Sequence, residues 1–237
     1  MRIDVLPDAD AAALKAAAII AGEVRAAASR GRFVMAVSGG HTPWQMLRAL
    51  AAEDLPWDRI HVLQVDERVA PAGDPARNLV HLRESLLAHA PLRPDQIHGM
   101  PVEDEDLERA ARNYAATLEQ LAGSPPVLDL VHLGLGPDGH TASLIPGDPV
   151  LRVNDRDVAL AGPYQGHQRM TLTYPVINRA RSILWLVTGG EKAPVLPRLL
   201  AGDQTIPGGR IAQERAVMIA DRAAASQLDE NKKEVRA

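Results

Sequence analysis

Short, largely apolar runs alternate with amphipathic stretches along the chain. Five runs are typical of strands buried on both faces of a sheet, at residues 33–37, 60–65, 128–133, 183–187 and 217–220. Two further short strands are predicted at 158–161 and 169–173. Helical spacing is found at 8–30, 43–50, 78–89 and 105–121, near Glu191, and in a short segment from Arg222. This alternation predicts an α/β fold, with a doubly wound, mainly parallel sheet and helices on both faces.

The length and composition favour one compact domain over residues 1–237. Of the 237 residues, 46% are hydrophobic, which is ample for a single core. The polar end, residues 230–237, is expected to fray. The net charge of −4 comes without a dense cluster of lysine and arginine, so we expect neither nucleic acid nor an anionic membrane as a partner.

Cysteine is absent, which excludes disulfides and thiolate chemistry. No apolar run approaches the roughly 20 residues of a membrane span. The first residues lack the apolar core of a signal peptide. These features predict a cytoplasmic protein, and they leave monomer and dimer open.

The sharpest candidate chemistry lies between residues 130 and 146. An apolar strand breaks at Gly134 and Gly136, and a tight turn then carries Asp138 and His140, before a short helical signal at Thr141. Ligands of open α/β sheets bind just beyond the carboxyl ends of strands. A neutral imidazole can take a proton from water near pH 7, and a carboxylate can orient it. The plainer alternative is that Asp138 is a turn residue and His140 a surface histidine. A metal site is not expected, because too few ligands have useful spacing.

A second candidate is the turn at residues 38–43, Ser-Gly-Gly-His-Thr-Pro, between a strand and a helix. Glycines such as Gly39 and Gly40 let the backbone approach a ligand, and the free N–H groups of the helix suit a phosphate. Ser38 and Thr42 add hydroxyls. The alternative is an ordinary turn in which Thr42 caps the helix.

Charged residues supply the remaining candidates. Asp66, Glu67 and Arg68 follow the second strand, where a carboxylate can bind sugar hydroxyls and a guanidinium can bind an oxyanion; they can equally form a solvated, self-paired run. Arg169 and Lys192 are lone cations. Lys192 stands near a helix start, where the helix dipole disfavours a cation unless an anion is bound. The alternative is that both cations are solvated.

Taken in order, these motifs resemble the 6-phosphogluconolactonase family, within the glucosamine-6-phosphate isomerase/6-phosphogluconolactonase superfamily. The matching segments are 38–43, 66–68 with Arg77-Asn78, 134–146, 169–173, Ile177-Asn178, 190–192 and 221–225. Each is weak alone, whereas the ordered set is specific. Two positions depart from the family pattern, Ile145 where an aromatic residue is usual and His41 where serine is frequent.

The resemblance implies a Rossmann-like fold and hydrolysis of 6-phospho-D-glucono-1,5-lactone, with no metal, cofactor or covalent intermediate. It implies His140 as general base, Asp138 as its orienting carboxylate, and Arg68 beside the ring or the developing oxyanion. A phosphate would be held by the remaining cations and the glycine loop, namely Ser38, Gly39, Gly40, Thr42, Arg169 and Lys192. Asp66 and Asn78 would contact hydroxyls or support the loop.

Two other functions stay open. The first is a related deaminase or aldose–ketose isomerase of sugar phosphates. In the deaminases that the chain resembles, the Asp-Gly-His loop continues into Ala-Phe-Asn-Glu-Pro, and this chain has Ile145 at the position of that glutamate. The second is a non-catalytic sugar-phosphate sensor, which would not need Asp138 and His140.

Overall fold

The computed structural model describes residues 1–27 and 31–228 of the chain. Its central feature is a sheet of seven parallel strands in the order β1-β10-β9-β6-β2-β3-β5. The strands are β1 (Arg2–Leu6), β2 (Phe33–Val37), β3 (Ile60–Gln64), β5 (Ile97–His98), β6 (Leu130–Leu133), β9 (Ser182–Val187) and β10 (Ala216–Asp221). The α/β class and the mainly parallel sheet that were predicted from the sequence are confirmed.

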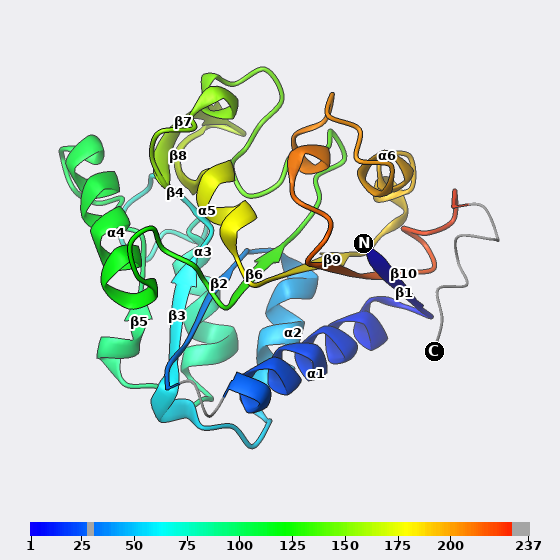
Figure 1. The fold of residues 1–237 in the computed structure, drawn as a ribbon, viewed down its shortest axis with the longest axis horizontal. Helices are drawn as coiled ribbons and strands as arrows, with labels where there is room; N and C mark the ends of the chain where they lie inside the picture. Colours follow the sequence, from blue (N-terminus) through cyan, green and yellow to red (C-terminus); the bar gives the residue numbers. More distant parts are fainter. Residues whose placement is uncertain (28–30, 229–237) are drawn as a thin grey trace.

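Helices cover both faces of the central sheet (Figure 1). One face is covered by α1 (Ala9–Ala27), α2 (His41–Ala51) and α3 (Asn78–Leu82); the other by α4 (Leu107–Ala122), α5 (Tyr174–Arg179) and α6 (Leu196–Leu200). Successive residues of a strand point to opposite faces, so each strand contributes to two cores. In β2, Met35 packs with α1 and α2, whereas Val34 and Ala36 pack with the elements on the opposite face.

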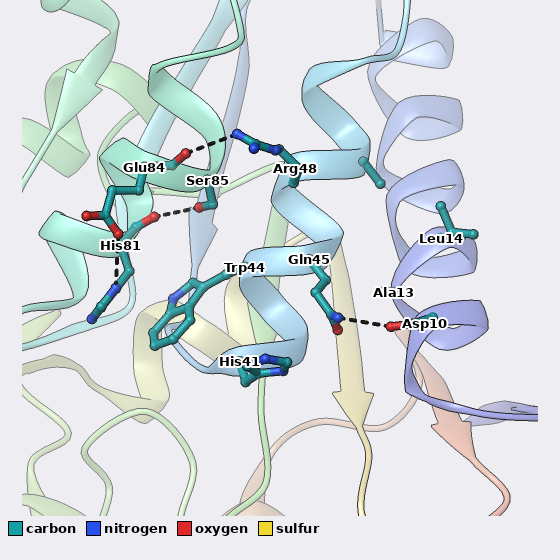
Figure 2. A pocket seen from close by; sticks show the side chains of 11 residues that line it. Asp10, Ala13, Leu14, His41, Trp44, Gln45, Arg48, His81, Glu84 and Ser85 are labelled. Atoms are coloured by element: carbon teal, nitrogen blue, oxygen red, sulfur yellow. Dashed lines mark hydrogen bonds and ion pairs between the residues drawn. The ribbon is translucent and has the colours of Figure 1, made fainter.

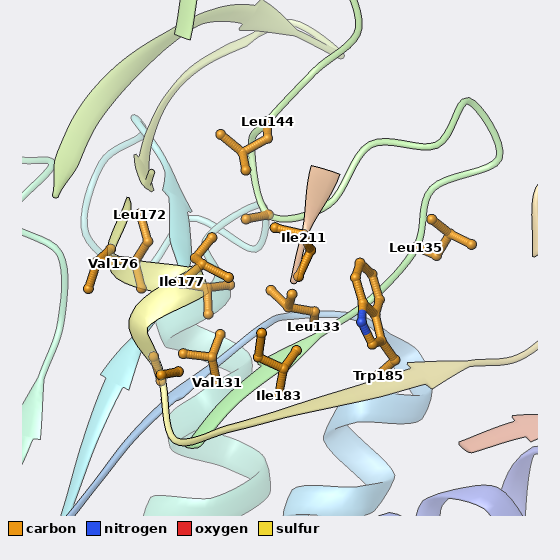
Figure 3. Packing of buried hydrophobic residues seen from close by; sticks show 14 of the residues in the cluster. Val131, Leu133, Leu135, Leu144, Leu172, Val176, Ile177, Ile183, Trp185 and Ile211 are labelled. Carbon is orange, nitrogen blue, oxygen red and sulfur yellow. The ribbon is translucent and has the colours of Figure 1, made fainter. Parts of the chain in front are cut away.

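The core on the α5 face is built from aliphatic side chains around one tryptophan. Figure 3 shows Leu133 of β6 between Ile177 of α5 and Trp185 of β9. All three are at most 1% exposed. At about 25 cal/mol for each Å² of apolar surface removed from water, burying such side chains is worth roughly 1.5–3 kcal/mol each. This packing anchors the strand end from which the 134–146 loop emerges.

A second, smaller sheet lies on the same side of the molecule as α5 (Figure 1). Its antiparallel strands have the order β4-β8-β7, with β4 at Asp66–Arg68, β7 at Val158–Tyr164 and β8 at His167–Leu172. The strands predicted at 158–161 and 169–173 therefore exist, but as a hairpin outside the parallel sheet. The Leu172 N–H donates to the Val65 carbonyl oxygen at 2.8 Å, which ties this sheet to the end of β3.

Several predicted helices differ in the structure. The helix predicted at 8–30 is α1, which ends at Ala27; the rest of that prediction, residues 28–30, lies outside the described residues. Residues 229–237 also lie outside them, so the fraying expected for 230–237 stays a prediction. The predicted helix at 78–89 is α3 continued by a π-helical segment, Arg83–Leu87. The segment from Arg222 forms turns. The helical signal at Thr141 is wrong, because Thr141 and Leu144 form an isolated antiparallel bridge.

The strand order places a ligand-binding crevice between β2 and β6. After β2 the chain moves to β3 on one side, and after β6 it moves to β9 on the other side. Ligands of open α/β sheets bind where neighbouring strands send the chain in opposite directions. The two loops that meet there are the 38–43 turn after β2 and the 134–146 loop after β6.

Candidate active site

The turn after β2 exposes the backbone of two glycines to the crevice. Gly40 has a φ of 133°, a conformation open to glycine, and a side chain at Gly39 would stand 2.0 Å from the Asn78 Oδ1 atom. The helix α2 begins at His41 without a side-chain cap, so its first N–H groups stay available to a ligand. Thr42 is therefore not the cap considered above; its hydroxyl is 2.7 Å from that of Thr188.

The turn after β6 is closed on itself by short hydrogen bonds. The Gly136 N–H donates to the His140 carbonyl at 2.8 Å, and the Thr141 hydroxyl donates to the Gly134 carbonyl at 2.8 Å. Ser143 joins this loop to β4, because its hydroxyl donates to Asp66 Oδ2 at 2.6 Å. These bonds compete with helix formation, which is why the signal at Thr141 does not become a helix.

Asp138 and His140 form a contact pair. The His140 Nδ1 atom lies 2.6 Å from Asp138 Oδ1, which also accepts the His140 backbone N–H at 3.1 Å. A carboxylate only accepts, so Nδ1 carries the proton and Nε2 is left as the basic nitrogen. Burial alone would raise the pKa of Asp138, but the hydrogen bonds and charge of His140, with a bond from Tyr164, outweigh it and lower that pKa. Asp138 is therefore a carboxylate at neutral pH.

Tyr164, at the end of β7, touches both members of this pair. Its hydroxyl lies 3.2 Å from Asp138 Oδ2 and 3.4 Å from His140 Nδ1. Its ring meets the His140 ring edge-on, with centroids 5.1 Å apart. The guanidinium of Arg169 lies over the same tyrosine ring, 5.2 Å from its centroid.

Arg169 is a buried cation with an unused donor. It is 4% exposed, its Nη1 lies 3.8 Å from Asp66 Oδ2, and its Nε has no hydrogen-bond partner among the described residues. Burial and the nearby charge of Arg68 lower its pKa. Arg68 and Arg169 are paired positions of β4 and β8, and two neighbouring guanidinium groups are stabilised by a bound anion.

The 66–68 segment is a buried strand, not the solvated charge run that was the alternative. Glu67 is fully buried and accepts the N–H groups of Arg68, Asn78 and Leu79 at 2.7–2.8 Å. It also lies 3.2 Å from Arg77 Nε. Arg68 donates to the Asn78 side-chain oxygen, and Asn78 donates to the Asp66 carbonyl at 3.1 Å. The Glu67 carboxylate thus fixes Arg68 and Asn78 beside Gly39.

One cavity of about 550 Å³ collects nearly every residue singled out from the sequence. It lies in the size range of small-molecule sites. Its lining includes Ser38, Gly39, Gly40, Thr42, Asp66, Arg68, Asn78, His140, Arg169 and Lys192. Asp138 stands behind His140 and is outside the lining. Lys192 enters from the loop after β9, where its Nζ lies 3.5 Å from Glu191 Oε1.

The sequence analysis missed other residues of this cavity. Gln165 lies on the β7–β8 hairpin, Thr188 follows β9, and Asp221 is the last residue of β10. Tyr164 of the same hairpin contacts Asp138 and His140 but lies outside the lining. Asp221 accepts the Gly189 N–H at 3.1 Å and so shapes the loop that carries Lys192. Position at the carboxyl end of a predicted strand was the available signal for Thr188 and Asp221. Gln165 has φ 51°, and the other non-glycine residue with positive φ among those described, Ala142, also lines the cavity.

A second cavity of about 550 Å³ lies between α1, α2 and α3. Figure 2 shows that its polar groups contact one another: Gln45 donates to Asp10, and Arg48 to the Glu84 carbonyl oxygen. Trp44 stacks on His81 with ring centroids 4.0 Å apart. Of the residues that line this second cavity, only His41 also lines the first. The acid–base pair and the buried cations belong to the first cavity.

Residues 1–27 and 31–228 bring no three His, Cys, Asp or Glu side chains together as metal ligands. In the same part of the chain, every helix is too short or too polar to span a membrane.

The fold and this cavity define an α/β protein with an acid–base pair and buried cations at the carboxyl ends of its parallel strands, and comparison with known proteins assigns the family. A family model described as glucosamine-6-phosphate isomerases/6-phosphogluconolactonase matches residues 7–220. The chain belongs to this family.

Similar proteins carry the lactonase name. A 6-phosphogluconolactonase of a Nostoc species is 37% identical over 204 residues, which cover 84% of this chain and 85% of that protein. One of a Synechocystis species is 42% identical over 181 residues, 75% of each chain. The structure of 6-phosphogluconolactonase from Trypanosoma cruzi matches with a TM-score of 0.86 at 27% identity and covers 96% of both chains. A monomeric glucosamine-6-phosphate deaminase shares the fold, with a TM-score of 0.81 at 22% identity.

Proposed function

We propose that the protein hydrolyses 6-phospho-D-glucono-1,5-lactone to 6-phospho-D-gluconate, a step of the oxidative pentose phosphate pathway. The observation that carries this proposal is the Asp138–His140 pair, 2.6 Å apart, at a cavity that also holds a glycine loop and buried cations. Family membership and relatives named 6-phosphogluconolactonase support the same substrate. We further propose that residues 1–237 form one domain and that the enzyme is cytoplasmic.

The reaction needs one base and an orienting carboxylate. His140 Nε2 removes a proton from a water molecule, and the water oxygen bonds to the lactone carbonyl carbon. The bond from that carbon to the ring oxygen then breaks, and the imidazolium returns its proton to the leaving oxygen. Asp138 holds the imidazole through Nδ1 and stabilises its charged form. Arg68 stabilises the oxygen that becomes negative in the tetrahedral intermediate.

The phosphate group positions the lactone for this attack. The N–H groups of Gly39, Gly40 and the first turn of α2 bind it from one side, with the hydroxyls of Ser38 and Thr42. Arg169 and Lys192 supply positive charge from the β8 strand and from the loop after β9. Binding energy from the phosphate is thereby used to orient a distant carbonyl. The hydrogen bonds of Asp66 and Asn78 favour loop support over hydroxyl contact as their role.

Deamination of glucosamine 6-phosphate fits the site less well. The position of the deaminase glutamate holds Ile145, which is 8% exposed and packs into the core. An alkyl side chain transfers no proton. A pure sensor would not need the Asp138–His140 contact.

The test is a side-by-side assay of one purified preparation. Freshly generated 6-phosphogluconolactone is followed with correction for spontaneous hydrolysis, and ammonia release is followed with glucosamine 6-phosphate. We expect rapid hydrolysis and no ammonia. Deaminase turnover equal to lactonase turnover, or no hydrolysis above background, contradicts the proposal.

A further inference from the structure

We propose that Tyr164 is a positioning residue that holds the Asp138–His140 pair and Arg169 in one rigid arrangement. The proposal rests on the lactonase function above and extends it to a residue outside the motifs that identify the family in this chain.

The hydroxyl of Tyr164 completes the contacts of the Asp138 carboxylate. Oδ1 of Asp138 is engaged by His140 at 2.6 Å, and Oδ2 accepts the Tyr164 hydroxyl at 3.2 Å. With both oxygens bonded, the carboxylate has a fixed plane, and Nδ1 of His140 has one partner direction. The Nε2 atom is thereby aimed consistently at the cavity. Burial and the charge of Asp138 raise the pKa of Tyr164, so the phenol remains a donor at neutral pH.

The ring of Tyr164 performs a second task. Its face lies under the Arg169 guanidinium at 5.2 Å, and its backbone carbonyl accepts from Arg169 Nη2 at 3.1 Å. The same ring meets the His140 ring in a T-shaped contact with centroids 5.1 Å apart. A cation over an aromatic face is attracted by the negative charge of the ring face. One side chain therefore sets the distance between the base and the buried cation.

The backbone that presents Tyr164 is well defined. Tyr164 pairs with His167 across a two-residue turn in which both residues have positive φ, 51° for Gln165 and 82° for Gly166. Such a turn matches the twist of the hairpin strands. The pairing register of β7 with β8 shifts between Ala161 and Tyr164. Such an irregularity changes the direction in which a side chain points, compared with regular alternation along the strand.

The main test is Tyr164→Phe, which removes the hydroxyl and keeps the ring. We expect kcat on 6-phosphogluconolactone to fall about tenfold, because a hydrogen bond to a carboxylate is lost, while KM stays within twofold. Tyr164→Leu also removes the ring and is expected to raise KM for the phosphorylated lactone several-fold. The matched control is Tyr174→Phe. Tyr174 also donates through its hydroxyl and carries an arginine, Arg210, over its ring at 5.7 Å, but its hydroxyl partner is the Pro207 carbonyl oxygen at 3.0 Å and not Asp138.

A double-mutant cycle separates positioning from general damage. In the Asp138→Ala background, Tyr164→Phe is expected to change kcat less than twofold, since the group it acts through is gone. A second full tenfold loss in that background overturns the proposal. So does a Tyr164→Phe enzyme with wild-type kcat, or a Tyr174→Phe enzyme with the same loss.

A readout without turnover keeps this inference separate from the proposed function. The imidazole nitrogen NMR shifts of His140 are expected to show a protonated Nδ1 in wild-type and Tyr174→Phe proteins, and a mixture of tautomers in Tyr164→Phe. Identical shifts in all three proteins overturn the positioning role, whatever substrate the enzyme uses. An inactive wild-type protein with the expected shifts would contradict the lactonase assignment alone.

Discussion

At the scale of single residues, the base depends on how little space surrounds it. The Nδ1 side of His140 contacts Asp138 and Tyr164 and lies close against the backbone of Gly136. The orientation of the His140 ring is thus fixed by Tyr164 and Gly136 as well as by the Asp138 carboxylate.

Replacing His140 by alanine removes the proposed base. We expect kcat to fall by about 10²–10⁴, the usual contribution of general base catalysis, with substrate affinity much less affected. The measurement is initial-rate kinetics corrected for spontaneous hydrolysis, with wild-type protein at equal concentration as the reference. Near wild-type kcat in the variant would rule out this role.

Gly136→Ala tests the geometry around His140 without touching a polar group. The new methyl carbon would stand 2.1 Å from His140 Nδ1 and 2.8 Å from Asp138 Oδ1, so the contact between these two side chains must rearrange. We expect at least a tenfold loss of kcat, with a Tm close to wild type, because the obstructing atom belongs to a movable side chain.

Gly134→Ala is the matched control for this substitution. A methyl group there meets no atom within 4 Å, although Gly134 belongs to the same loop. Equal kcat in the two variants would show that the close approach at Gly136 has no catalytic consequence.

A site residue can be predicted from the sequence when it has a chemically suitable side chain or is a glycine, and lies in a turn that follows a predicted strand. Ser38, Gly39 and His140 lie in turns directly after predicted strands, and all line the cavity. Tyr164 carries no such signal, because its contact with Asp138 depends on a hairpin turn and a register shift. For Glu67 the sequence left a ligand contact and a solvated charge run as alternatives, since sequence spacing does not show that five hydrogen-bond and ion-pair partners surround this carboxylate.

At the scale of elements, different loops at the strand ends carry the proposed base and the proposed phosphate contacts. The loop after β6 carries the base, and the loops after β2 and β9 approach each other through the contact of Thr42 with Thr188 at 2.7 Å. The proposed phosphate site is therefore assembled from separate loops that one sheet holds in register.

Lys192→Ala tests the contribution of the loop after β9. Loss of a charged contact at a largely desolvated site costs about 1.5–3 kcal/mol, so kcat/KM for the phosphorylated lactone should fall roughly 10- to 100-fold. Activity on unphosphorylated glucono-1,5-lactone should change little. Lys15→Ala, on an exposed position of α1, is the control. Equal losses on both substrates would mean that Lys192 does not read phosphate.

Strands buried on both faces were predictable, and exposed or very short ones were not. The runs that became β2, β3, β6, β9 and β10 are apolar because helices cover both sides of them. β1 is an edge strand with Arg2 and Asp4 in its five residues, and β5 has two residues, so neither has a clear pattern. β7 and β8 were predicted as strands but not as a separate antiparallel sheet with β4, because residue patterns do not reveal strand partners.

At the scale of the whole molecule, the parallel sheet contains buried histidines that affect stability, and one of them also supports the site. Buried His132 of β6 lies directly beneath the site, where its Nδ1 accepts the Ser38 N–H at 3.2 Å. Burial lowers the pKa of His132 from 6.5 to about 3. At the far edge of the sheet, His61 and His98 lie 3.1 Å apart, and burial lowers both of their pKa values too. All three histidines are thus neutral in the native protein near pH 7.

These lowered pKa values predict loss of stability in acid. Between pH 6.5 and about 3, the unfolded chain binds a proton at His132 that the folded protein does not, so the free energy of unfolding falls as pH falls. The contribution is fully present above pH 6.5 and is lost at up to about 1.4 kcal/mol for each pH unit below it. We expect His132→Asn to flatten this slope, because an amide oxygen can still accept the Ser38 N–H but the side chain takes up no proton. The measurement is urea unfolding at a series of pH values, with His89→Asn at an exposed position as the control. A His132→Asn slope as steep as that of the control would show that His132 does not govern acid unfolding.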